Sequence, residues 1–203
     1  NYGQKLMAFS GFNLLHGFLR NNWNLTHSMA NNFTAFTHAS LSVLFAGSYL
    51  LSRQFEFSGA ENLYKVCRIV STGYFSYDIV HIITHGKRTK LNLLYLYHHL
   101  ASTYLIQHNP VIYRCAEVLF WGELSNLPMY MVYYHIKSKS NKAIIDFWKT
   151  TQALGYTAIR LPILSYVTYD ALSNVEDRFP IYTCLPVYFM GIFWSINLCK
   201  KLA

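Results

Sequence analysis

The sequence LNLLYLYHHLASTYLIQH at residues 91–108 is an apolar run without a charged residue, and two adjacent histidines lie near its centre. A helix of about 20 mostly apolar residues crosses the hydrocarbon core of a bilayer, so this run predicts a membrane-spanning helix. Polar side chains inside such a span usually face a protein interior. On a helix His98 and His99 point about 100° apart, so both rings can reach one cavity, with Tyr95 and Ser102 a turn away.

Apolar runs of similar length flank this one on both sides. They predict five further spans and a shorter first one, at residues 33–52, 63–84, 111–136, 143–169, 180–199 and 6–19. Pro128 and Pro162 fall inside two of the runs and are expected to kink or tilt those helices. We therefore predict an all-α, polytopic transmembrane bundle of six spans, with 6–19 as a candidate seventh, forming one domain over residues 1–203.

Composition and charge agree with a membrane protein. Of the 203 residues, 53% are hydrophobic and only 13% are charged, against about 25% charged in soluble domains. The net charge of +8 comes mainly from Lys and Arg between the apolar runs, which favours contact with anionic lipid headgroups over nucleic acid. The basic side chains near 137–142 and 200–201 place the C-terminus in the cytosol by the positive-inside rule. The final residues KKLA resemble a retrieval signal for the endoplasmic reticulum, or else form an ordinary basic anchor.

Further polar residues lie in neighbouring predicted spans. Asp78 is well inside 63–84 and needs a partner, for which an imidazole from 91–108 is the natural candidate; His81 follows on the same helix face. Another polar stripe in 111–136 and a histidine in 33–52 complete the candidate substrate-binding set. That set is His38, His81, Tyr95, Ser102, Glu123, Asn126 and Tyr130. The alternative for each is a structural hydrogen bond inside the bundle.

Four segments in this order resemble the TLC-domain family, which includes the ceramide synthases and the translocating-chain-associated membrane proteins. They are His38-Ala-Ser, GYFSYD at 73–78, YHHL at 97–100 and ELSNLP at 123–128. The resemblance covers about residues 31–203 and leaves 1–30 as an extra N-terminal helix and loop. It implies a helix bundle around a lipid-accessible cavity.

In ceramide synthases the paired histidines and acidic residues move an acyl group from acyl-CoA to a sphingoid amine. The resemblance therefore implies His98 and His99 as the catalytic pair and Asp78 as a supporting carboxylate, with acyl-CoA or an acyl lipid as donor and no bound cofactor or metal. The ceramide synthase signature continues into a His-Asp pair and another Asp, whereas this chain has ELSN at 123–126. That difference places it closer to the smaller TLC-domain proteins. Membrane lipids are the expected partners, and the sequence leaves a homo-oligomer open.

Three other classes of function compete with lipid acyl transfer. A di-iron hydroxylase or desaturase would use the His81-x-x-x-His85 spacing, but it needs about eight histidines in several boxes, and Tyr95 stands where His-x-x-His-His requires a histidine; the same residue argues against an elongase. A lipid-binding, sensing or trafficking protein would keep the cavity without turnover. A pump or channel is disfavoured because the acidic residues form no relay across the spans.

Overall fold

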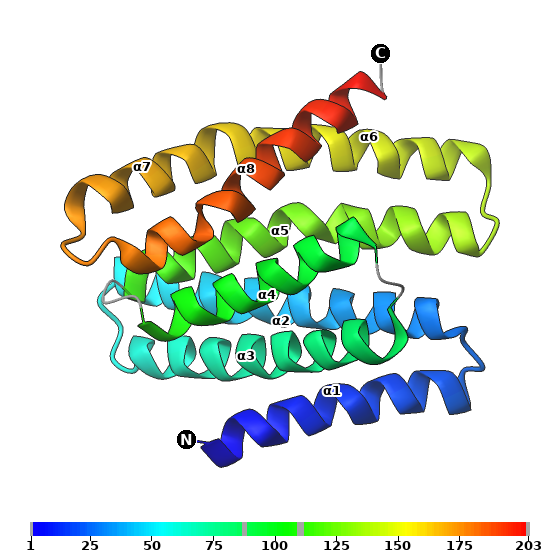
Figure 1. Cartoon of the computed structure of the whole chain (residues 1–203), viewed down its shortest axis with the longest axis horizontal. Helices are drawn as coiled ribbons and strands as arrows, with labels where there is room; N and C mark the ends of the chain where they lie inside the picture. The colour runs from blue at the N-terminus through cyan, green and yellow to red at the C-terminus, as the bar shows by residue number, and fades with distance from the viewer. Residues whose placement is uncertain (1, 87–88, 109–111, 202–203) are drawn as a thin grey trace.

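The computed structural model describes residues 2–86, 89–108 and 112–201, and these residues form helices joined by short connections, with no strand among them. The helices lie side by side as long rods, and α8 runs obliquely across α6 while it also packs against α4 (Figure 1). Their bounds are α1 (Tyr2–Asn22), α2 (His27–Gln54), α3 (Ala60–His85), α4 (Lys90–His108), α5 (Ile112–Lys137), α6 (Lys142–Ala158), the π-helical turn η1 (Ile159–Ile163), α7 (Leu164–Asn174) and α8 (Phe179–Lys200). Because α6, η1 and α7 follow without a break, the described chain forms seven rods.

Each of the seven predicted apolar runs falls in one of these rods, which confirms the all-helical fold class. Residue 111, at the start of one run, and residues 202–203 of the KKLA sequence lie outside the described residues. Helices of 19 to 28 residues are about 28–42 Å long, which is close to or above the thickness of about 30 Å of a hydrocarbon core. By length and composition, two of the described helices, α2 and α8, are apolar enough to cross a membrane. The count of six or seven spans stays a prediction.

Several ionisable side chains are buried in the bundle, and many large apolar side chains lie on its surface. His38, Asp78, His99 and Glu123 are buried, whereas large apolar side chains on several helices are exposed, among them Leu14, Ile83, Leu93, Phe189 and Phe193. In water such a surface would be costly, while in lipid the apolar side chains face a solvent that suits them. This distribution is typical of a helical membrane protein.

Helix α2 lies at the centre of the bundle, packed against both α3 and α5. Its buried face carries small side chains at four-residue intervals, Ala30, Thr34, Ser42 and Ala46, with His38 between them. Small residues let helix backbones approach closely, which is how helices associate in lipid. This tight packing holds His38 fully out of solvent and brings α3 and α5 to opposite sides of one interior.

Helix α1 packs closely on α3 at a glycine. A Cβ atom placed on Gly73 would lie 2.5 Å from the Cβ of Ala8 and 2.9 Å from the backbone of Ala8 and Phe9. Only glycine therefore allows this approach of the two backbones. The contact brings His16 of α1 next to the C-terminal half of α3, where Tyr77, His81 and His85 lie.

The two prolines inside predicted spans behave differently. Pro128 lies within α5, which stays α-helical from Ile112 to Lys137. Pro162 lies in η1, where five residues adopt the π-helical pattern and interrupt the α-helix. Such turns are often found at functional sites because they free backbone groups and redirect side chains. Arg160 belongs to this turn.

Candidate functional site

A cavity of about 710 Å³ lies between the helices and opens at one end of the bundle. Side chains from α2, α3, α4, α5, α6, η1 and α8 line it, and its polar lining includes Asp78, His98, His99, Glu123 and Arg160. A cavity of this size suits a small molecule or a lipid headgroup with part of a chain. Most of the polar residues singled out in the sequence therefore face one common space.

The closest contact in the site joins α3 to α4. His99 Nε2 lies 2.7 Å from Asp78 Oδ2, and both side chains are buried. The carboxylate accepts the Nε2–H hydrogen bond, which leaves the lone pair of the ring on Nδ1. Neither His99 Nδ1 nor Asp78 Oδ1 has a hydrogen-bond partner among the described residues. The predicted contact between Asp78 and an imidazole of the His98–His99 pair is thus present, with His99 as the partner.

His98 is the second imidazole of the pair, and its ring centre lies 5.2 Å from that of His99. It lines both the large cavity and an adjoining one of about 120 Å³. His98 Nδ1 has no hydrogen-bond partner among the described residues. Two neighbouring rings, each with an unpartnered nitrogen, can accept protons from a bound amine or hydroxyl.

A second polar group stands opposite, on α5 and η1. Asn126 donates from Nδ2 to Glu123 Oε2 at 3.3 Å, and its Oδ1 accepts from Arg160 at 3.3 Å. Arg160 also donates to the Ser125 hydroxyl at 3.0 Å and the Gly122 carbonyl at 3.2 Å. Arg160 therefore ties the π-helical turn to α5 and brings a positive charge to the cavity wall.

The sequence analysis missed Arg160. The signal was available, because a charged residue lies inside the apolar run 143–169, two residues before Pro162. A charge within a predicted span is by itself a functional-site candidate. From this run we predicted only a span with a proline, and Arg160, its one arginine, was not among the predicted site residues.

His38 was predicted to bind substrate, but it lines neither cavity. Its ring stacks on Tyr74 with centres 4.0 Å apart and planes 8° from parallel, and its Nε2 meets the Ser42 hydroxyl at 3.0 Å. His38 Nδ1 lies 3.9 Å from Glu123 Oε1, which is beyond hydrogen-bond distance. The close packing of α2 places the ring one layer behind the cavity wall, where it supports Tyr74 and Glu123.

The remaining predicted substrate-binding residues are divided between the two cavities. His81, Tyr95, Asn126 and Tyr130 line the large cavity, and Ser102 lines the small one. The small cavity shares His98, Glu123, Asn126 and Arg160 with the large one and is otherwise mostly apolar, with residues such as Leu164, Val167 and Leu185. These shared polar side chains therefore lie between two cavities with much apolar lining, an arrangement that fits an amphipathic ligand.

An apolar exterior around a buried polar cavity defines a helical membrane protein with an internal site. Residues 25–200 match the family model described as the TLC domain. The chain therefore belongs to the TLC-domain family, and this membership implies a lipid-related function in a membrane. No curated protein and no solved structure gives a significant match to the chain.

Proposed function

We propose that the chain is a membrane-embedded lipid acyltransferase that moves a fatty acyl group to a lipid amine or hydroxyl. One observation carries this proposal: a buried Asp78–His99 pair lies beside His98, which lines both a large cavity with several polar side chains in its wall and a smaller, mostly apolar one. A hydrogen-bonded carboxylate holds an imidazole in one tautomer and offsets the charge that forms when the ring takes a proton.

In the proposed reaction the acceptor amine or hydroxyl enters the large cavity beside His98 and His99. The acceptor nitrogen or oxygen attacks the acyl carbonyl while an imidazole takes its proton. The new amide or ester bond forms, the bond from the acyl carbon to the donor sulfur or oxygen breaks, and the proton passes on to that leaving group. Asp78 stabilises the imidazolium between the two steps.

The side chains of Arg160 and Asn126, which lie across the cavity from the histidines, would stabilise the negative charge that develops on the acyl oxygen. The acyl carbonyl oxygen gains charge in the transition state, and the Arg160 guanidinium and Asn126 amide are donors on the cavity wall. The small, mostly apolar cavity next to His98 would receive the part of the acyl chain nearest the carbonyl. Its apolar wall would keep water away from the acyl carbon and so limit hydrolysis.

The proposal is tested by acyl transfer in lipid nanodiscs. The purified protein is supplied with isotope-labelled acyl-CoA and a lipid extract, and new acyl lipids are identified by mass spectrometry. We expect labelled product with the wild type and a loss of about 100-fold or more in His98→Ala and His99→Ala, the scale of general acid–base catalysis. His135→Ala is the matched control, because His135 lies at the end of α5 and lines neither cavity.

Two results would contradict this function. Absence of labelled product in the wild type, with lipid found in the cavity by native mass spectrometry, would favour a non-catalytic lipid-binding or trafficking protein. Product formation that survives both histidine substitutions would place the chemistry elsewhere. If His135→Ala lost as much labelled product as the His98→Ala and His99→Ala variants, the assay would report folding rather than catalysis.

A further inference from the structure

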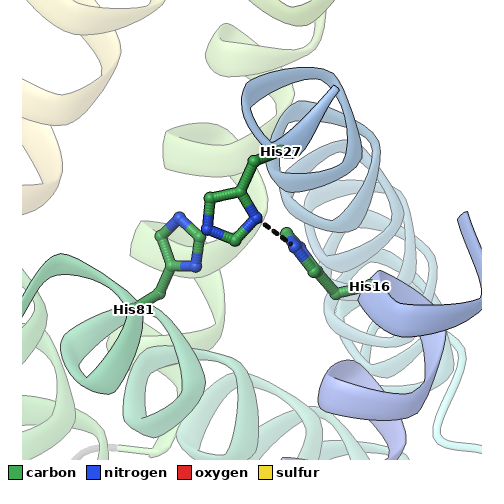
Figure 2. Close-up of side chains that lie close together, drawn as sticks. All are labelled: His16, His27 and His81. Atoms are coloured by element: carbon green, nitrogen blue, oxygen red, sulfur yellow. Dashed lines mark hydrogen bonds between the residues drawn. The ribbon is translucent and has the colours of Figure 1, made fainter. Parts of the chain in front are cut away.

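Three histidines outside the Asp78–His99 pair converge at one end of the bundle. His16 comes from the last third of α1, His27 from the first turn of α2 and His81 from the last turns of α3, and their rings face one another (Figure 2). The ring centres lie 4.7 Å apart for His16–His27, 5.4 Å for His16–His81 and 4.6 Å for His27–His81. One ring nitrogen from each lies within 4.8 Å of the others.

The contact of His16 with the Tyr77 hydroxyl leaves the other ring nitrogen of His16, Nε2, available as a metal ligand. The Tyr77 hydroxyl lies 2.7 Å from His16 Nδ1 and donates to Asn31 Oδ1 at 3.0 Å. A hydroxyl has one proton, so when it is donated to Asn31 the same oxygen accepts from His16 Nδ1–H. The lone pair of His16 is then on Nε2, which points at His27. Metal-ligating histidines are usually held by such an outer hydrogen bond on the other ring nitrogen.

His27 provides the second candidate ligand. Its Nδ1 lies 2.8 Å from His16 Nε2, and its Nε2 is buried without a hydrogen-bond partner among the described residues. Two nitrogens that each lie about 2.0–2.1 Å from a tetrahedral zinc ion are about 3.3 Å apart. A shift of about half an ångström would replace the shared hydrogen bond with two bonds to a metal, provided that the proton on His27 Nδ1 moves to His27 Nε2. The His81 nitrogen lies within 4.8 Å of the other two, so it would move closer by up to about 1.5 Å.

We propose that His16, His27 and His81 bind one zinc ion at the mouth of the large cavity. Imidazole is a preferred ligand of zinc, and three histidines with an open fourth position form a known zinc geometry. His27 and His81 line the cavity, so the fourth position faces it and is available to water or to an oxygen of a bound molecule. His85 is exposed beside them, with its ring centre 4.4 Å from that of His27.

The charges around the cluster are mixed. Asp78 precedes His81 by one helical turn, and its unpartnered Oδ1 provides negative charge on the same side of the cavity. Arg20 follows His16 by one turn on α1 and opposes a cation. Neutral imidazoles bring no charge of their own, and three of them can hold zinc without a charged ligand, so Asp78 adds local negative charge without being required for binding. The site also ties α1 to α2 and α3, so bound zinc would stabilise that end of the bundle.

The test measures metal in a protein purified without a polyhistidine tag. Zinc is added, excess is removed by gel filtration, and the bound metals are counted by inductively coupled plasma mass spectrometry. We expect about one zinc ion per chain in the wild type, and less than a tenth of that in His16→Asn, His27→Asn and His81→Asn. His108→Ala removes an exposed histidine at the C-terminal end of α4, and this variant is expected to keep the wild-type zinc content.

Cobalt provides a readout on the wild-type protein that does not depend on how the variants fold. A Co²⁺ ion bound by three imidazoles in a tetrahedral site gives strong visible absorption bands, and zinc should displace it and abolish them. Absence of these bands in folded wild type together with no retained zinc would overturn the proposal. Retained iron in place of zinc, or zinc that survives all three substitutions, would also overturn it. None of these readouts requires acyl transfer, so the two proposals fail separately.

Discussion

His99 and His16 are both buried and both contact neighbouring side chains through their ring nitrogens, yet the two sites are suited to different chemistry. The partner of His99 is the Asp78 carboxylate, whereas His16 meets the Tyr77 hydroxyl and another imidazole. A carboxylate stabilises a protonated ring and favours a base. A hydroxyl fixes the tautomer without adding charge, and the convergence of three imidazoles is what favours a metal at His16. The groups around each of the two histidines therefore indicate different chemistry.

The largest expected effect comes from removing the carboxylate from the first site. Asp78→Asn keeps the shape of the side chain but removes the charge that stabilises the His99 imidazolium. We expect acyl transfer to fall by about 10²–10⁴-fold, while the zinc content stays near one per chain because Asp78 contributes no ligand. The two quantities are measured on the same preparation, by labelled-product formation and by metal analysis.

Asp146→Asn is the matched control for this comparison. Asp146 lies on α6 with an exposed side chain, 3.9 Å from Lys149, so its substitution should change neither quantity. If Asp78→Asn kept full acyl transfer, the Asp78–His99 pair would be structural. Loss of zinc in Asp78→Asn would mean that the two sites form one unit, and the contrast drawn between them would be wrong.

A smaller effect is expected from separating α1 from the rest of the bundle. Gly73→Val puts a branched side chain where a single Cβ would already meet Ala8 at 2.5 Å. Because α3 is also held by α2 and α4, we expect α1 to move and His16 to leave the cluster. Most of the bound zinc should then be lost. Acyl transfer should fall much less, because the contact between Asp78 and His99 does not involve α1.

Gly11→Val tests whether the position or the substitution causes this loss. No heavy atom outside α1 lies within 4 Å of a Cβ placed on Gly11, so the variant should keep its zinc. Metal analysis compares the two variants, and thermal unfolding checks that both remain folded. Equal zinc content in Gly73→Val and the wild type would show that α1 does not carry a ligand.

Sequence reasoning predicted the helices and the contact between Asp78 and an imidazole of the His98–His99 pair, but not the cluster of three histidines. Long apolar runs are a strong signal for helices in lipid, and Asp78 and His98–His99 stand out because each interrupts such a run. His16 and His27 give no such signal, since one lies in the shortest apolar run and the other between runs. Their approach to His81 depends on the rotation of α1 about its axis and on the contact at Gly73, which no spacing in the sequence specifies.

The smallest expected effect tests the outer contact that orients His16. Tyr77→Phe keeps the ring and removes the hydroxyl that lies between His16 Nδ1 and Asn31. Without this contact His16 can adopt either tautomer, and part of the zinc-binding energy is spent on fixing it. We expect the zinc affinity to fall by about 10–100-fold, as is usual for such outer partners, and the Co²⁺ absorption bands to shift. Tyr77 lines neither cavity, so the zinc affinity should change without a matching loss of acyl transfer.

Tyr166→Phe is the matched control. It removes an exposed hydroxyl on α7 and should leave both the zinc affinity and the Co²⁺ bands unchanged. A Tyr77→Phe protein with wild-type affinity and spectrum would mean that the hydroxyl serves only the packing of α1 on α3.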